Sequence, residues 1–316
     1  MTAIIDTHCH YNMKPISDDV SAHWKKAQEN GIEKTITVGA DLITSKKALE
    51  ISDEFSGIYA SIGLHPEICN DAIKELLVGD KYFQGEINQY VDDNLHELTE
   101  ILNDALTTNF ALGSESELEN KNKLVAIGEI GLDYYRLKNK GLKRNLVVEM
   151  QKKLFQKQLE LAFQNNLVAI IHVRDQSDRL ENNAYFDVLN ILKKVISEIE
   201  TPKEAKFVLH CASGPLAYVK EAIALGAYIG IAGNITYNTA QDLREIVKIT
   251  PKNRLLLETD APYLVPKSMQ NPTKDKDQFC EPYMIKATAD YLQQDMGLNL
   301  DIILDNTNCL FFNKFD

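Results

Sequence analysis

The chain has 316 residues, of which 44% are hydrophobic and 25% charged, values of a globular protein that exclude disordered and fibrous classes. Its 46 acidic and 34 basic residues give a net charge of −12, which excludes a protein that coats nucleic acid through a broad basic surface. Without a long apolar run, a signal peptide or paired cysteine spacing, we expect an intracellular protein, cytoplasmic or nuclear or both, with no membrane association and no obligate protein partner.

Short runs rich in β-branched residues alternate with longer segments that carry apolar residues at helical spacing, such as 148–163 and 183–199. Alternating strands and helices predict a parallel sheet of the α/β class, and eight such units predict a closed (β/α)8 TIM barrel. The competing architecture is a doubly wound open sheet, which usually has a glycine-rich phosphate loop after its first strand; this sequence has none there. The expected strands are 3–6, 34–38, 58–63, 124–128, 167–171, 206–209, 227–231 and 254–258.

One stretch between the third and fourth expected strands is longer than a single crossover needs. Within it, 72–77 and 86–106 predict helices, whereas 112–123 is polar and low in complexity. We therefore expect a single barrel domain over 1–316 with an insertion at approximately 79–123. Because loops accept insertions at low entropic cost, we expect a solvated loop in preference to a lid or a partner surface.

Histidines mark the ends of the expected strands. Active sites of (β/α)8 barrels lie at the carboxyl ends of the strands, so these histidines are candidate site residues. Residues two apart on a strand share a face, which places both imidazoles of the D-x-H-x-H motif on one side and Cys9 on the other, packed as a small apolar residue. Two imidazoles on one face can bind a single metal ion. The histidines concerned are His8, His10, His65, His172 and His210.

Carboxylates lie at two further strand ends. Glu129 ends the fourth expected strand. A carboxylate at the end of an apolar strand is costly to bury unless it is paired with a charge, hydrogen-bonded or bound to a metal. Glu258 and Asp260 share a face at the end of the eighth strand, and Asp260, farther along, is the better ligand candidate. The resulting nitrogen and oxygen donors exceed what one catalytic zinc needs and suit two divalent metals that share a bridging carboxylate. This set is His8, His10, Glu129, His172, His210 and Asp260.

The motifs D-x-H-x-H, G-L-H-P, G-E-x-G-L-D, H-x-R-D, L-H-C and E-T-D-A-P-Y-L together resemble the TatD family of metal-dependent deoxyribonucleases within the amidohydrolase-like barrels. The resemblance runs from Thr2 to about Phe312, interrupted by the insertion. It implies a (β/α)8 barrel, two divalent ions (Mg²⁺, Mn²⁺ or Zn²⁺), DNA as the substrate, and hydrolysis of phosphodiester bonds as a 3′-to-5′ exonuclease.

The resemblance also implies roles for individual residues. One metal would take His8, His10 and Asp260, and the other His172 and His210, with Glu129 between them. Glu129 and Asp260 would be the catalytic carboxylates, Asp260 accepting the proton of the attacking water. The scissile phosphate would be held by His65, Arg174 and Asp133.

The sequence departs from the family pattern at two places. Ala212 replaces an aromatic residue in the usual H-C-F-T-G, and Cys280 replaces the asparagine of R-N-E-P, so the ligands survive while substrate preference is less defined. The main alternative is a dinuclear amidohydrolase acting on a small C–N substrate. Many such barrels bridge their metals with a modified lysine on the fourth strand, and Glu129 at that position favours the phosphodiesterase. A second alternative, a binding module with a degenerate site, is disfavoured because no ligand candidate is missing.

Overall fold

The computed structural model of the protein describes residues 3–76, 84–108, 123–137, 141–176, 183–199, 205–271 and 278–312. All the strands belong to one sheet, in the order β1 to β8, and every neighbouring pair is parallel. A parallel bridge between Cys9 and Ala261 brings the two ends of the sheet together. The strands are β1 (Ile4–Cys9), β2 (Ile32–Val38), β3 (Ile58–Ile62), β4 (Leu124–Asp133), β5 (Val168–Arg174), β6 (Phe207–Leu209), β7 (Tyr228–Ile231) and β8 (Leu255–Leu257).

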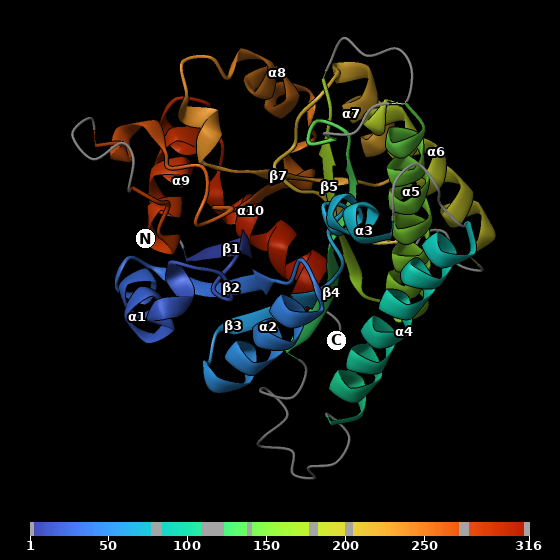
Figure 1. Ribbon diagram of the computed structural model, residues 1–316. Coiled ribbons are helices and arrows are strands. Elements are labelled where there is room, and N and C mark those ends of the chain that lie inside the picture. The colour runs from blue at the N-terminus through green and yellow to red at the C-terminus, as the bar shows by residue number, and fades with distance from the viewer. Residues whose placement is uncertain are drawn as a thin grey trace.

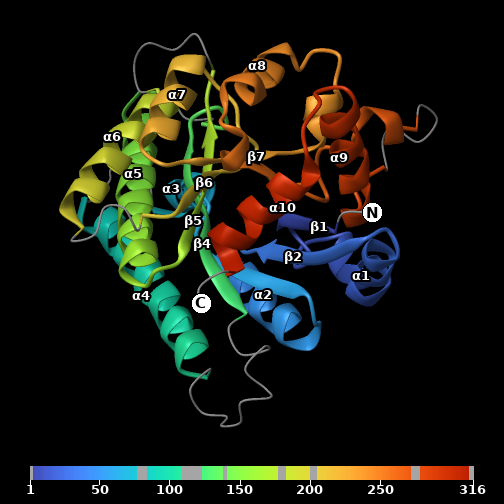
Figure 2. The ribbon, with the colours of Figure 1, turned by 180° about the vertical axis from the view of Figure 1, so that it is seen from behind.

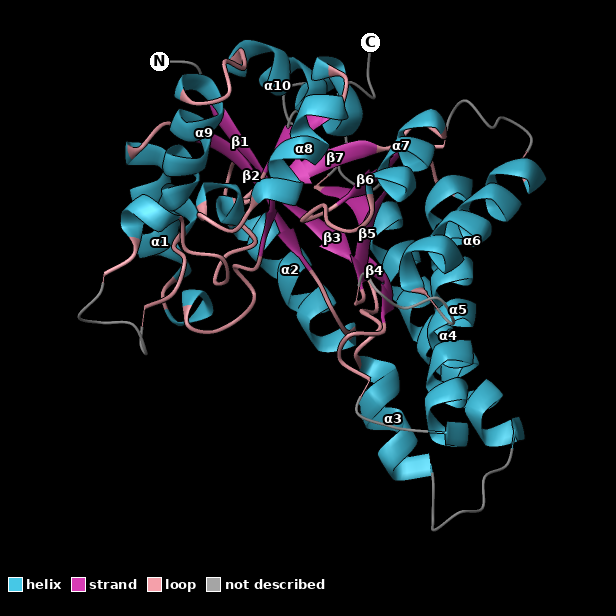
Figure 3. Ribbon diagram, turned by 90° about the horizontal axis from the view of Figure 1, so that it is seen from above, coloured by secondary structure: helices cyan, strands magenta, loops and turns pink. Residues whose placement is uncertain are grey.

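Helices surround this sheet, as Figures 1 and 2 show from opposite sides and Figure 3 from above. They are α1 (Val20–Glu29), α2 (Leu42–Glu54), α3 (Ile68–Leu76), α4 (Gln84–Thr108), α5 (Gly141–Gln164), α6 (Ala184–Glu198), α7 (Leu216–Ala224), α8 (Gln241–Ile249), α9 (Ile285–Gln294) and α10 (Leu300–Thr307). The prediction of a (β/α)8 barrel is confirmed. No helix in the described ranges is long and apolar enough to cross a membrane.

Local sequence explains where several helices begin. Asp41 precedes α2 and accepts a hydrogen bond from the Thr44 amide, while the Thr44 hydroxyl accepts from the Asp41 amide, a capping box. Asn183 caps α6 with a single hydrogen bond, which its side-chain oxygen accepts from the Tyr185 amide. These caps satisfy amides that the first helical turn leaves unpaired, and they fix where each helix starts after its strand.

The apolar core has two layers. One lies between the sheet and the helices, and the other fills the interior of the barrel, where side chains from the strands meet the two residues Leu310 and Phe311 near the carboxyl end of the chain. Because side chains fill the interior, the barrel is a packed core without a channel, and a functional site can form only at the strand ends. The buried interior residues are Ile36, Val38, Val125, Ala126, Val168, Ile170, Val208, Leu256, Leu310 and Phe311.

The insertion differs from its expectation. The two expected helices are present as α3 and α4, but α4 lies along α5 and also packs on α2 and α3 (Figures 1 and 2). Its inward face is buried through Ile87, Val91, Leu98, Ile101 and Leu102. A solvated loop is therefore wrong for 84–108, because an apolar helical face needs a partner. The polar segment 112–122 lies outside the described residues.

Removing a buried side chain of α4 should destabilise the protein. Leu98→Ala is expected to lower the free energy of unfolding by about 2–5 kcal/mol, because Leu98 is fully buried and its removal leaves a cavity. Urea denaturation followed by circular dichroism measures this change. Ile43→Ala, which truncates an 80% exposed side chain on α2, is the matched control with little expected effect. An equally small effect of Leu98→Ala would contradict the packing of α4.

Candidate metal centre

The predicted ligand residues converge at the carboxyl edge of the barrel. His8 lies within β1 and His10 just after it, Glu129 lies in β4 and His172 in β5. The remaining residues follow strand ends: His65 after β3, His210 after β6 and Asp260 after β8. Their side chains are buried or nearly so, the most exposed being Asp260 at 16%.

One half of the centre consists of His8, His10 and Asp260. The Nε2 atoms of the two histidines are 3.2 Å apart, and Asp260 Oδ1 lies 3.7 Å from His8 Nε2 and 3.6 Å from His10 Nε2. The Nδ1 atom of His10 lies 2.8 Å from the carbonyl oxygen of Val38. A proton on Nδ1 makes that hydrogen bond and leaves the lone pair of Nε2 directed at the cluster, as metal binding requires.

The other half consists of His172, His210 and His65. The distances from Glu129 Oε1 are 2.8 Å to His172 Nδ1, 3.1 Å to His210 Nε2 and 3.7 Å to His65 Nε2. The second carboxylate oxygen, Oε2, faces the first half, 3.7 Å from His8 Nε2 and 3.8 Å from His10 Nε2. The Glu129 carboxylate thus stands between two groups of imidazoles and presents one oxygen to each.

A bulge in β4 directs Glu129 into the centre. Residues Ile127 and Ile130 pair with Ala169 and Ile171 of β5, so that two residues of β4 face one residue of β5. Such a bulge re-aims a side chain out of the normal strand alternation. Gly128 permits the close approach, because a Cβ atom there would lie 2.5 Å from the Cβ of Ile170. Sequence alternation alone did not indicate this bulge.

A second layer of carboxylates lies behind the histidines. Glu258 is buried, and its Oε1 accepts a hydrogen bond from the Cys211 amide and lies 3.4 Å from His210 Nδ1. Asp133 Oδ2 lies 3.4 Å from His172 Nε2, and the Asp133 side chain has no exposed surface. Carboxylates in such positions orient the imidazoles and raise their basicity. For Asp133 this role follows more directly from the geometry than the expected contact with phosphate.

Charge compensation shapes the pKa values in the centre. Burial acts to raise the pKa of Glu129, but His210, His65 and hydrogen bonds from the imidazoles outweigh it and hold that pKa well below its usual range. Burial lowers the pKa of His8, and it lowers that of His65 to about 3. Burial also acts to lower the pKa values of His10 and His172, but hydrogen bonds to Asp260, Asp133 and Glu129 outweigh it and raise them. A metal that binds at these two imidazoles therefore displaces their protons.

These donors fit a divalent metal. Among the described residues, four groups of three each bring ligand atoms within 4.8 Å of one another, and His8, His10 and Glu129 form one of them. The chemistry of the set, imidazole nitrogens with carboxylate oxygens, suits zinc, manganese or magnesium. The facing nitrogens of His8 and His10 repel one another unless a proton or a cation lies between them.

The remaining predicted residue, Arg174, lies at the rim. It ends β5, is exposed, and its guanidinium carbon is 4.3 Å from the ring centroid of Tyr135. Besides Tyr135, sequence reasoning missed two further rim residues, Arg136 and Tyr263. Arg136 donates to Glu67 and lies 3.8 Å from Asp133, while the Tyr263 ring centroid is 6.2 Å from that of His10. Both were visible as charged or aromatic residues shortly after the G-E-x-G-L-D and E-T-D motifs.

Comparison with known proteins identifies the family. A family profile described as "TatD related DNase" matches residues 5–315. The chain belongs to this family. It is 29% identical over 291 residues to the uncharacterized metal-dependent hydrolase YabD of Bacillus subtilis, covering 92% of this chain and 90% of that protein. The TatD-type barrel is thus that of a metal-dependent hydrolase.

Two further relatives of this TatD protein bear on its activity and fold. It is 26% identical over 269 residues to the "3'-5' ssDNA/RNA exonuclease TatD" of Pantoea vagans, covering 84% of this chain and 82% of that one. The crystal structure of the TatD homologue YjjV from Escherichia coli superposes with a TM-score of 0.69 at 26% identity, covering 98% of this chain and 97% of the other.

Proposed function

We propose that this TatD protein is a divalent-metal-dependent exonuclease that hydrolyses phosphodiester bonds at the 3′ end of DNA. The observation that carries the proposal is Glu129, whose two carboxylate oxygens face separate groups of imidazoles. A carboxylate between two cation sites is the arrangement of dinuclear phosphoryl-transfer centres. The name of the Pantoea vagans relative supports a nucleic-acid substrate and this polarity.

The proposed roles follow the two halves of the centre. His8, His10 and Asp260 would hold one ion, His172 and His210 the other, and Glu129 would contact both. When bound, two ions lower the pKa of a water and polarise the phosphoryl oxygens. His8 remains neutral near pH 7, since burial lowers its pKa, and so keeps its lone pair.

Other residues of the chain handle the proton and the phosphate. Asp260 Oδ1 lies within 3.7 Å of both histidines of its half, where it would accept the proton of the attacking water. His65 and Arg174 would contact the phosphate, His65 from within the centre and Arg174 from the rim. Asp133 would act on the phosphate through His172, which it orients.

Products from labelled oligonucleotides test the proposal. The protein is stripped of metal with EDTA, supplied with Mg²⁺, Mn²⁺ or Zn²⁺, and incubated with a strand labelled at its 5′ end. We expect a ladder that shortens by one nucleotide at a time, and release of a mononucleotide at once from a 3′-labelled strand. No cleavage with any ion, together with hydrolysis of a cyclic amide, would contradict the proposal and support the C–N hydrolase.

A further inference from the structure

Two tyrosines lie exposed beside the metal centre. Tyr135 follows β4 and is 51% exposed, and Tyr263 follows β8 and is 52% exposed. Among the aromatic side chains of the described ranges, only Phe186 on α6 shares this degree of exposure. Single exposed apolar side chains are common on protein surfaces, so these two rings are distinguished by their position next to candidate ligand residues.

Backbone contacts tie each ring to the centre. The Tyr263 amide donates to the Asp260 carbonyl, 2.8 Å away, and its ring meets the His10 ring edge-on, with an interplanar angle of 77°. The Tyr135 amide lies 3.3 Å from the Arg174 carbonyl. The Arg174 guanidinium lies over the Tyr135 ring, with its carbon 4.3 Å from the ring centroid, and Tyr135 is still 51% exposed.

Cationic side chains accompany the two rings. Arg136 is half-exposed, donates to Glu67 and lies 3.8 Å from Asp133, and Arg174 lies against Tyr135. We call these four residues, Tyr135, Arg136, Arg174 and Tyr263, the rim surface. Aromatic faces backed by guanidinium groups bind single-stranded nucleic acid, because the rings stack on bases and the cations attract phosphates.

Resting on the proposed function, we propose that Tyr135 and Tyr263 stack on the two bases that flank the scissile phosphate. The two tyrosines follow different strands, β4 and β8, and each strand end also carries a candidate ligand, Glu129 or Asp260. Bases in a duplex are paired and stacked and offer no free face, so this arrangement selects an unpaired end. With a net charge of −12, the protein gains little affinity from the phosphates along a long strand. Most of the binding free energy must then come from contacts with the last nucleotides.

A cycle of changes in protein and substrate tests the stacking. Three single-stranded oligonucleotides are compared: one intact, and two with an abasic residue at the last or the second-last position. Wild type should lose about five- to a hundredfold in kcat/KM at each abasic position, the usual worth of one stacked base. On the intact strand, Tyr263→Ala should lower kcat/KM by the same factor. An abasic residue at the position on which Tyr263 stacks should then cause no further loss in this variant. Tyr135→Ala should behave in the same way with the abasic residue at the other position.

A second readout does not depend on turnover. The fluorescence of 2-aminopurine at either position, in a strand with a phosphorothioate at its last linkage, should be quenched on binding to wild type. Each alanine variant should abolish quenching at its own position only. Tyr263→Phe keeps the ring and should keep both the quenching and the abasic penalty.

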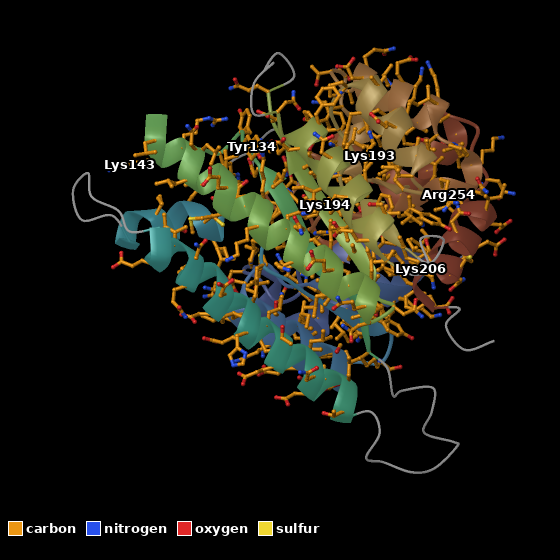
Figure 4. The ribbon with its side chains drawn as sticks, turned by 90° about the vertical axis from the view of Figure 1, so that its right-hand side faces the viewer. Tyr134, Lys143, Lys193, Lys194, Lys206 and Arg254 are labelled. Carbon is orange, nitrogen blue, oxygen red and sulfur yellow. The ribbon has the colours of Figure 1, made fainter. Side chains whose placement is uncertain are left out.

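Tyr228→Ala is the matched control. Tyr228 also stacks on an arginine, with Arg254 Cζ 4.6 Å from its ring centroid, but at the start of β7, at the amino ends of the strands. Figure 4 shows Arg254 well apart from Tyr134, the neighbour of Tyr135. This variant should behave as wild type in every assay.

The stacking proposal is wrong if Tyr135→Ala and Tyr263→Ala both keep two wild-type properties: the loss of kcat/KM at each abasic position and the quenching of 2-aminopurine. If wild type cleaves no oligonucleotide with any metal, the proposed function fails, and the quenching experiment still decides by itself whether the two tyrosines stack on bases.

Discussion

Glu129→Gln is expected to lower kcat/KM on DNA by at least about a thousandfold, which corresponds to ~4 kcal/mol of transition-state stabilisation. The side chain keeps its volume but loses the charge that faces both groups of imidazoles. We also expect a lower content of bound metal per chain than in the wild type, by at least one ion if the centre holds two as proposed. Kinetics and metal analysis on one preparation measure both effects.

The control for this change is Glu245→Gln, which makes the same substitution on the surface of α8, where Glu245 pairs with Lys248. It should keep full activity and metal content. Both variants should melt cooperatively, which separates loss of the centre from loss of the fold. If Glu129→Gln retains more than about a tenth of the wild-type rate, the bridging role is incorrect.

Asp260→Asn should remove one ion and leave the other. Asp260 Oδ1 lies within 3.7 Å of His8 and His10, whereas His172 and His210 contact Glu129 on the other side. We expect metal content to fall by one ion per chain and kcat to fall about a hundred- to a thousandfold, since a ligand and a proton acceptor are lost together.

The backbone tolerates this substitution. Asp260 has a φ of 57°, in the left-handed region, where asparagine is as acceptable as aspartate. A loss of activity in Asp260→Asn therefore reflects the carboxylate and not the turn. Unchanged metal content with unchanged kcat would contradict the assignment of Asp260 to the centre.

The insertion shows where local sequence was informative and where it failed. The apolar spacing of 86–106 predicted a helix, and α4 (Gln84–Thr108) is that helix. The same spacing did not reveal its partner, and the expectation of a solvated loop was wrong because α4 buries Val91 and Leu98 beside α5. The spacing of apolar residues predicts which face of a helix is buried, but the surface that covers this face belongs to another part of the chain.

The sequence by itself determined the fold class and which residues meet. Parallel strands have their carboxyl ends at one edge, so the histidines and carboxylates that follow strand ends, such as His10, His210 and Asp260, must converge there once the strands are recognised. That convergence requires no knowledge of packing. The proposed ligand set could therefore be named before any coordinates, although its metal-binding role stays a prediction.

Only the tertiary structure decided where these side chains point and which of them contact one another. The direction of Glu129 depends on a bulge that forms where β4 pairs with β5, and the place of Asp133 behind His172 depends on the same pairing. The rim pair Tyr135 and Tyr263 comes from strands more than a hundred residues apart in the chain. Strand periodicity fixes a face only within a regular strand, and bulges, turns and contacts between distant strands arise from interactions that no local window contains.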